Sequence, residues 1–374
     1  MKYNILNFTK KVFLKISFNI SRLFKEPQIK KNQKELLEKK YDSKNSNLII
    51  FLTSGYDMVN GGILSISSIY EETKNFDEIQ GSQTILCSVP GEPLLLEYTK
   101  FKNKNYIYNL PLILSYFHDL NNLIIHIPEY ACGLFLKNIS NKEFSVLDKI
   151  CNLHINILIQ NIDIFNENLE DIELIKKRFP NVTGTTAHQN YSNLKNRQKF
   201  GFPLHKLSTY VSPEQYNNKS YSEKEELMIV SNDKHPRRSE ILKIFQKTFP
   251  NLKIKVIENM TYAEFKNNIS KAKWALTFGE GLDGYFIESI FSGAISFSVY
   301  NPRFFTEDFE SLPTVYQNYD ELIKIMPSDL KRLNNKKNYT NYQKQQYNLC
   351  SKYYDYREYQ KNLKLFYQGD YTFK

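Results

Sequence analysis

Cysteine and long apolar runs are scarce in this chain of 374 residues. The four cysteines, Cys87, Cys132, Cys151 and Cys350, form no C-x-x-C pair. This argues against a disulfide framework and a structural zinc site, and it favours a reducing compartment. Residues 1–26 are too charged to span a bilayer, which takes about 20 largely apolar residues. They also lack the continuous apolar core of a secretory signal peptide.

Several ligand-binding patterns are also missing. The sequence has no G-x-G-x-x-G pattern, so no dinucleotide site is predicted, and it has no convincing Asp-x-Asp metal pair and no internal repeat. The formal net charge is +10, but residues 1–44 hold twelve Lys/Arg and four Asp/Glu, a net +8 that leaves +2 for the rest. Because a nucleic-acid-binding protein usually carries its basic patch on the folded domain, we expect no nucleic-acid partner.

The basic extension has the pattern of an amphipathic helix over residues 1–26. Apolar residues recur there at helical spacing among Lys and Arg, and Pro27 is expected to end the helix. Such a helix fits an anionic membrane surface. The alternative is that its apolar face docks on the body of the protein. Residues 28–46 are predicted to form a polar connector, so the whole extension covers residues 1–46.

Short apolar strands then alternate with helical stretches, which predicts an α/β fold with parallel sheets. The chain length suggests about two domains, and the polar segment Val211–Glu226 is typical of a linker. We predict one domain over residues 47–215, a second over 216–335 and a helical tail over 336–374. The clearest strands are Asn47–Thr53, Gln83–Val89, Leu123–Ile127, Ile155–Ile159, Leu227–Ser231, Leu252–Glu258, Trp274–Phe278 and Ala294–Val299.

The stretch Trp274–Asn301 combines a buried strand, three glycines, a short helix and a second strand. In a parallel sheet such a glycine loop lies at the carboxyl end of a strand, where open α/β sheets bind ligands. The loop N–H groups and the helix N-terminus suit a phosphate. Gly279, Gly281 and Gly284 are therefore candidate donor-binding residues.

Two carboxylates accompany these glycines, Glu280 in the loop and Glu288 inside the helix. They can approach one ligand from different sides. A carboxylate accepts two hydroxyl hydrogen bonds at once, which suits a ribose diol. The alternative is that both are ordinary solvated residues.

The spacing of Glu280 and Glu288, the glycines between them and the Ser-Gly-Ala before the next strand resemble the E-x7-E signature of GT-B-fold glycosyltransferases. The similarity is greatest to the large retaining family that uses nucleotide sugars. The resemblance implies two Rossmann-like domains facing across a cleft, a C-terminal cross-over helix and no metal or other cofactor. It implies that Glu288 binds the ribose and that Glu280 lies near the donor sugar. The loop departs from the family pattern at Leu282–Tyr285, where Asp283 is unusual beside a pyrophosphate.

In the first domain, polar groups follow the predicted strands. Gly61-Gly62 comes after the first strand, and the resemblance puts such a pair near the donor phosphates or the acceptor; a plain turn is the alternative. His126, Glu129 and His188 lie at strand ends or in the following loops. A histidine there can bind sugar hydroxyls or act as acid or base. For His126 the alternative is a buried structural histidine.

A basic loop opens the second domain, with Lys234, Arg237 and Arg238 between a strand and a helix. These cations suit a pyrophosphate, because Arg offers a bidentate fork and Lys a point charge. The resemblance puts an Arg/Lys pair here against the leaving diphosphate. Lys234 and Arg238 are the candidates, with Arg237 as a substitute, and a solvated loop is the alternative.

These features predict a glycosyltransferase of the hexosyltransferase type that uses a nucleotide-sugar donor. The expected acceptor is a lipid-linked or surface glycan, such as bacterial capsule, O-antigen or lipooligosaccharide, at the inner face of the cell membrane. A retaining reaction is favoured, and an inverting enzyme would need a base such as His126, His188 or Glu129. The alternative is a catalytically inactive GT-B-like peripheral membrane protein that binds a nucleotide sugar or polyanion.

Overall fold

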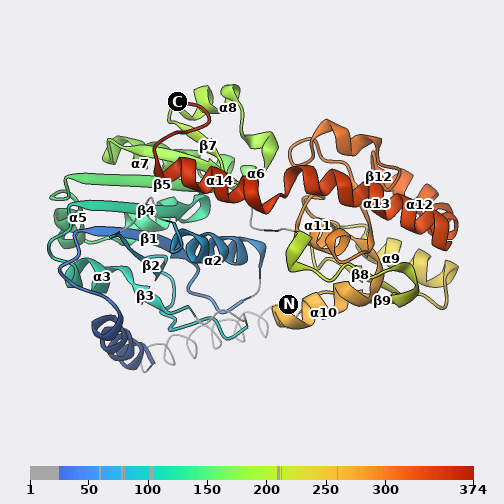
Figure 1. The fold of residues 1–374 in the computed structure, drawn as a ribbon, viewed down its shortest axis with the longest axis horizontal. Helices are drawn as coiled ribbons and strands as arrows, with labels where there is room; N and C mark the ends of the chain where they lie inside the picture. Colours follow the sequence, from blue (N-terminus) through green and yellow to red (C-terminus); the bar gives the residue numbers. More distant parts are fainter. Residues whose placement is uncertain are drawn as a thin grey trace, which may run out of the picture.

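The chain folds into two α/β units that lie side by side and are bridged by C-terminal helices (Figure 1). No helix of the described ranges is both long enough and apolar enough to cross a membrane. The computed structural model describes residues 25–58, 60–76, 79, 81–100, 105–208, 211, 213–258 and 260–374.

The first unit is built on a seven-stranded sheet. Its strands are β1 (Asn47–Thr53), β2 (Gln83–Ser88), β3 (Ile107–Asn109), β4 (Asn122–Pro128), β5 (Asn152–Ile159), β6 (Val182–Thr186) and β7 (Leu204–Lys206). They run parallel in the order β3-β2-β1-β4-β5-β6-β7. Side chains alternate between the two faces of a strand, so Leu48 and Ile50 of β1 pack in one core and Ile49 and Phe51 in another.

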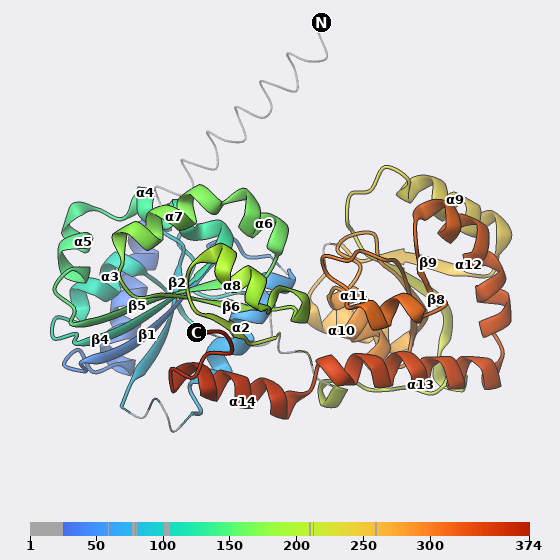
Figure 2. The same cartoon turned by 90° about the horizontal axis from the view of Figure 1, so that it is seen from above.

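Helices cover both faces of this sheet, as a parallel sheet requires. The helices of this unit are α2 (Gly61–Thr73), α3 (Leu110–Tyr116), α4 (Cys132–Asn138), α5 (Asn141–Leu147), α6 (Ile162–Glu167), α7 (Leu169–Arg178) and α8 (Leu194–Phe200). Figure 2 shows α4 to α7 over one face, and α2 with the C-terminal helix α14 (Tyr356–Tyr367) over the other.

The second unit has a five-stranded parallel sheet. Its elements are β8 (Glu225–Val230), α9 (Arg238–Thr248), β9 (Lys253–Val256), α10 (Tyr262–Lys271), β10 (Ala272–Leu276), α11 (Gly284–Phe291), β11 (Ile295–Val299), β12 (Val315–Tyr316) and α12 (Tyr319–Leu333). The strand order is β12-β11-β10-β8-β9. The predicted fold class, two Rossmann-like domains with a C-terminal cross-over helix, is thereby confirmed.

The cross-over consists of two helices, whereas the sequence pattern predicts one helical stretch. α13 (Lys336–Tyr353) packs on the second domain and α14 on the first. The helix is interrupted between them, because Asp355 caps α14. The Asp355 side chain accepts a hydrogen bond from the Glu358 N–H (3.0 Å). Glu72 of α2 fixes α14 by accepting hydrogen bonds from the Tyr356 hydroxyl (2.9 Å) and the Gln360 amide (2.7 Å).

The N-terminal extension differs from its prediction. Residues 25–40 are helical, so Pro27 does not end the helix, and most of the connector predicted for residues 28–46 is ordered secondary structure. The amphipathic pattern of residues 1–24 lies outside the described residues.

Buried contacts explain this helix. Leu37 is fully buried in the first core, and so is the polar side chain of Gln33. The Gln33 amide donates to the carbonyl groups of Ile107 (2.8 Å) and Leu95 (3.2 Å) and accepts from the Asn109 N–H (3.2 Å). Gln33 thus satisfies the backbone at β3, the edge strand of the sheet.

Candidate functional site

The glycine loop lies between β10 and α11, at the carboxyl edge of the second sheet. Asp283 caps α11, accepting hydrogen bonds from the Phe286 N–H (3.0 Å) and the Thr277 hydroxyl (2.5 Å). The helix N-terminus proposed for a phosphate therefore already holds a carboxylate. Gly281 has φ +89°, and a Cβ atom there would meet the Phe305 ring at 2.4 Å, so this turn requires glycine.

Glu280 projects from this loop toward the first domain. Its Oε1 accepts a hydrogen bond from the Asn161 amide, and its Oε2 lies 4.0 Å from Nε2 of His188. Burial, and after it the negative charge of the neighbouring Asp283, raise the pKa of Glu280 to about 8. A carboxyl group with this pKa is largely protonated near neutral pH, so Glu280 can donate or accept a hydrogen bond.

His188 follows β6 and is buried. Burial lowers the pKa of His188 to about 4, so its ring is neutral near pH 7. Its Nδ1 is buried with no hydrogen-bond partner in the described part of the chain. The ring packs edge-on against Tyr191 (5.1 Å between centroids) and Phe304 (5.9 Å). The structure therefore brings His188 together with Glu280.

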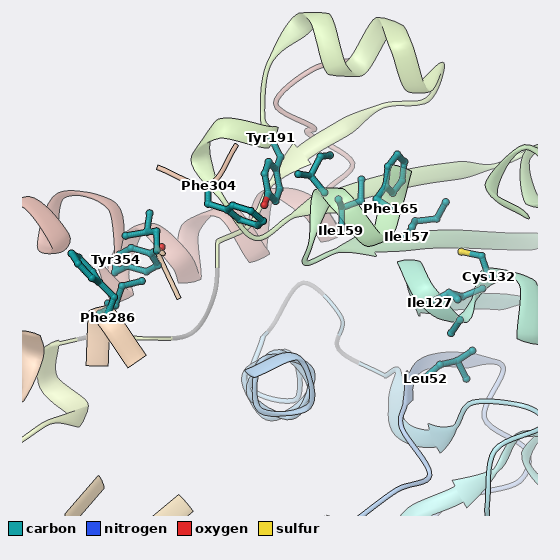
Figure 3. Packing of buried hydrophobic residues seen from close by; sticks show 14 of the residues in the cluster. Leu52, Ile127, Cys132, Ile157, Ile159, Phe165, Tyr191, Phe286, Phe304 and Tyr354 are labelled. Carbon is teal, nitrogen blue, oxygen red and sulfur yellow. The ribbon is translucent and has the colours of Figure 1, made fainter. Parts of the chain in front are cut away.

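The two domains meet around this pair. Tyr191 of the first domain packs against Phe304 of the second, with ring centroids 6.1 Å apart (Figure 3). The Asn190 amide donates to the carbonyl of Phe305 (2.8 Å), and Arg303 pairs with Asp163 at 2.6 Å. A cavity of about 10 Å³ lies beside Phe304, lined by residues of both domains.

A larger cavity, about 300 Å³, lies elsewhere in the first domain, lined by Lys40, Lys74 and Gln83 among others. Gln83 begins β2, so this cavity is at the amino edge of the sheet, away from the glycine loop. We place the candidate site at the carboxyl edges, because ligands bind there in open α/β sheets.

Glu288 is buried within α11, away from the contacts of Glu280. Its Oε2 accepts hydrogen bonds from the hydroxyl groups of Tyr216 (2.7 Å) and Tyr262 (3.1 Å). Its Oε1 lies against Gly284, where an added Cβ atom would approach it to 2.8 Å. Burial raises the pKa of Glu288 to about 7, and the two tyrosine hydroxyls oppose that rise.

The basic loop lies against the glycine loop. A Cβ atom at Gly279 would meet the Asp233 carboxylate at 2.7 Å. Lys234 is exposed, whereas Arg238 donates to the Asp233 carbonyl (3.0 Å). Arg237 is tied to Glu240 and Asp320 on the far side, bridging α9 and α12. Lys234 and Arg238 thus lie near the glycine loop, and Arg237 is committed to a structural ion pair.

His126 is not brought to this site. Its ring stacks on Phe51 (4.2 Å), and its two nitrogens lie within hydrogen-bond distance of the Asn156 amide (2.9 Å) and the Tyr367 hydroxyl (3.2 Å). Burial lowers its pKa, which keeps the ring neutral. These contacts fit the structural alternative, and we do not include His126 in the candidate site.

Gly62 and Glu129 contact the two residues that follow β5, the second of which, Asn161, reaches Glu280. Gly61 and Gly62 begin α2, and Gly62 accepts a hydrogen bond from the Gln160 amide (3.2 Å). Glu129 is buried and accepts from the N–H groups of Gln160 (3.2 Å) and Asn161 (2.9 Å). Burial raises the pKa of Glu129 to about 7. Glu129 therefore holds the backbone of Asn161 in place.

Three residues of this arrangement, Asn161, Tyr216 and Tyr262, are not among the predicted site residues. Asn161 stands two residues beyond β5, and polar residues at the carboxyl end of a strand are a signal that could have found it. Tyr216 and Tyr262 belong to a linker and a helix start in a chain with 27 tyrosines. Nothing in their local sequence distinguishes them from the other tyrosines.

No protein-family model matches the sequence, and no curated protein matches it. Solved structures do share the fold. Sucrose-phosphate synthase from Thermosynechococcus elongatus is 9% identical and covers 86% of this chain and 98% of its own, with a TM-score of 0.54. HepE from Anabaena in complex with UDP-glucose is 8% identical over 86% of this chain and 99% of its own, with a TM-score of 0.53.

The N-terminal domain of trehalose-6-phosphate phosphatase from Candida albicans is similar in the same way. It is 10% identical over 88% of this chain and 98% of its own, with a TM-score of 0.54. At such low identity the similarity shows the fold alone. The fold is the GT-B arrangement of two Rossmann-like domains.

Proposed function

We propose that the protein is a glycosyltransferase that takes a sugar from a nucleotide-sugar donor. The main support for this proposal is the contact of Glu280 with Asn161 and His188. That contact joins the carboxyl edges of the two parallel sheets at the glycine loop, where open α/β sheets bind ligands. The HepE structures with UDP-glucose and with UDP support a nucleotide-sugar ligand. The E-x7-E resemblance supports the same class.

In this proposal the second domain binds the donor. Glu288 takes the ribose diol, while Lys234 and Arg238 stabilise the departing diphosphate, where negative charge develops. In a retaining reaction the anomeric carbon–diphosphate bond breaks and the acceptor oxygen bonds to that carbon on the same face. The hydroxyl proton passes to a phosphate oxygen, so neither a protein base nor a metal is needed. Glu280 and the neutral His188 lie where the donor sugar would meet the acceptor.

We further propose a lipid-linked or surface glycan as the acceptor, such as a capsule or lipopolysaccharide precursor. The basic amphipathic pattern of residues 1–26 supports attachment to the inner face of the cell membrane, because Lys and Arg attract anionic lipids. That pattern lies almost wholly outside the described residues, so its support comes from the sequence.

A binding screen tests the proposal. UDP, GDP, dTDP and CMP are each added to the wild type and to Glu288→Ala, and thermal unfolding is followed. One nucleotide is expected to stabilise the wild type, by about 2.7 kcal/mol at a hundredfold excess over Kd, and to leave Glu288→Ala nearly unchanged. Tyr221→Phe, a linker change at a hydroxyl that donates to Asn334, should behave as the wild type. If none of the four shifts the wild type, donors that carry any of these nucleotides are excluded.

The carboxylates of the loop predict a pH dependence of this binding. The pKa of Asp283 is raised to about 7 and that of Glu280 to about 8 by burial. Both groups ionise as the pH rises through these values, and their negative charge then repels a diphosphate. The affinity for the nucleoside diphosphate is therefore expected to fall about tenfold or more between about pH 6 and pH 9.

Asp283→Asn is the matched variant for this prediction, because asparagine also caps a helix. It is expected to bind more tightly than the wild type above about pH 7 and to show a flatter pH profile. Isothermal titration calorimetry in buffers of different ionisation enthalpy should also show less proton uptake in the variant. A profile identical to that of the wild type would exclude Asp283 from the phosphate region.

A further inference from the structure

The oxygen Oε2 of Glu288 already has two hydroxyl donors. They come from Tyr216 at 2.7 Å and Tyr262 at 3.1 Å, and the two hydroxyl oxygens are 3.2 Å apart. Two adjacent O–H groups that donate to one carboxylate are also what a ribose offers through its 2′- and 3′-hydroxyls. Oε2 of Glu288 cannot accept both hydroxyls of a ribose diol while the two tyrosine hydroxyls remain in place.

We propose that Tyr216 and Tyr262 stand in for the ribose diol in the ligand-free protein, and that the donor nucleoside displaces Tyr216. This inference rests on the proposed function, since it takes Glu288 to be the ribose-binding residue. Its new element is that the donor competes with a side chain from the connection between the domains.

The two tyrosines differ in how firmly they are held. Tyr262 is the first residue of α10, a helix closed by a capping box at Thr261. Tyr216 instead follows the short turn Pro213–Gln215 in the segment between β7 and β8. Displacing Tyr216 moves the backbone of that segment alone and separates its ring from Phe291, whereas displacing Tyr262 would disturb a helix start.

Lys266 connects this pair to the linker. Its ammonium lies over both tyrosine rings, 4.6 Å from the centroid of Tyr216 and 5.3 Å from that of Tyr262. It also donates to the carbonyl of Gln215 (2.9 Å). When a ribose displaces Tyr216, the Lys266 ammonium loses its contact with the Tyr216 ring. The linker also loses the hydrogen bond from Tyr216 to Glu288. Donor binding is thereby coupled to the segment that joins the two domains.

The test compares binding of UDP and 2′-deoxy-UDP by calorimetry to the wild type, Tyr216→Phe and the control Tyr221→Phe. Tyr221 lies in the same segment, but its hydroxyl donates to Asn334 (3.0 Å). Tyr216→Phe removes the competing hydroxyl and keeps the ring. We expect it to bind UDP about tenfold more tightly than the wild type, whereas Tyr221→Phe should match the wild type.

The second nucleotide tests the ribose itself. The wild type should prefer UDP to 2′-deoxy-UDP, and the gain in Tyr216→Phe should be smaller for the deoxynucleotide, which has only one of the two hydroxyls. Tyr262→Phe is a second variant that removes the other donor and should also gain affinity for UDP. If the wild type binds UDP and Tyr216→Phe binds it equally or more weakly, the stand-in inference is overturned while the proposed function survives. If the wild type binds no nucleoside diphosphate, both are overturned.

Discussion

The variant Glu280→Gln is expected to transfer sugar about 100-fold more slowly than the wild type while still binding the nucleotide. Glutamine keeps a carbonyl oxygen that can accept the hydrogen bond from Asn161, so the contact between the domains is retained. What is lost is the carboxyl group beside His188, where the donor sugar and the acceptor would meet. Removing one polar group that contacts a transition state typically costs a factor of this size.

The measurement is release of the nucleoside diphosphate from the donor that the binding screen identifies, with kcat and KM determined separately. The slower transfer should appear as a lower kcat with a nearly unchanged KM. The reason is that Glu288 and the basic loop, not Glu280, bind the nucleotide in our proposal. Glu225→Gln is a matched control, since Glu225 is exposed at the start of β8, on the opposite edge of the same sheet. Equal values of kcat for Glu280→Gln and the wild type would remove Glu280 from the reaction.

Much of the local structure around the glycine loop follows from short-range signals. The apolar run before Gly279 forms β10, and the helical spacing after Gly284 forms α11. Gly293 takes φ +90° after that helix, as expected for a residue that ends it. Thr261 and Glu264, three positions apart, form a capping box at the start of α10. Each of these features depends on residues a few positions apart, which a single sequence displays.

Contacts between distant residues could not be predicted in this way. The hydrogen bond between Asn161 and Glu280 joins positions 119 residues apart, and that between Tyr216 and Glu288 joins positions 72 apart. The strands β3, β7 and β12 have two or three residues each, too few to show a period of two. Gln33 is polar in sequence but fully buried, because it binds the backbone of an edge strand. Only the assembled fold supplies these partners.

The variant Lys224→Met is expected to lower the free energy of unfolding by about 3 kcal/mol. Lys224 is buried just before β8, and its ammonium donates to the carbonyl groups of Ile269 (3.3 Å), Ser270 (3.0 Å) and Ser292 (2.5 Å). These carbonyls lie at the C-terminal ends of α10 and α11, where the last C=O groups lack partners inside the helix. A single amino group thus satisfies the ends of the two helices that carry Tyr262 and Glu288. Burial lowers the pKa of Lys224 to about 7, so the group donates all three of its protons only below that pH.

Methionine preserves the length of the side chain and removes its donors, so the three carbonyl groups would remain buried with too few partners. Urea denaturation should show a lower midpoint with an unchanged m-value. Lys253→Met is the matched control, because Lys253 is exposed on β9, and its effect should stay within about 0.5 kcal/mol. Equal losses in the two variants would mean that Lys224 acts through general charge instead of through the helix ends. Because α10 and α11 together position the residues around Glu288, Lys224→Met should also weaken nucleotide binding, whereas Lys253→Met should leave it unchanged.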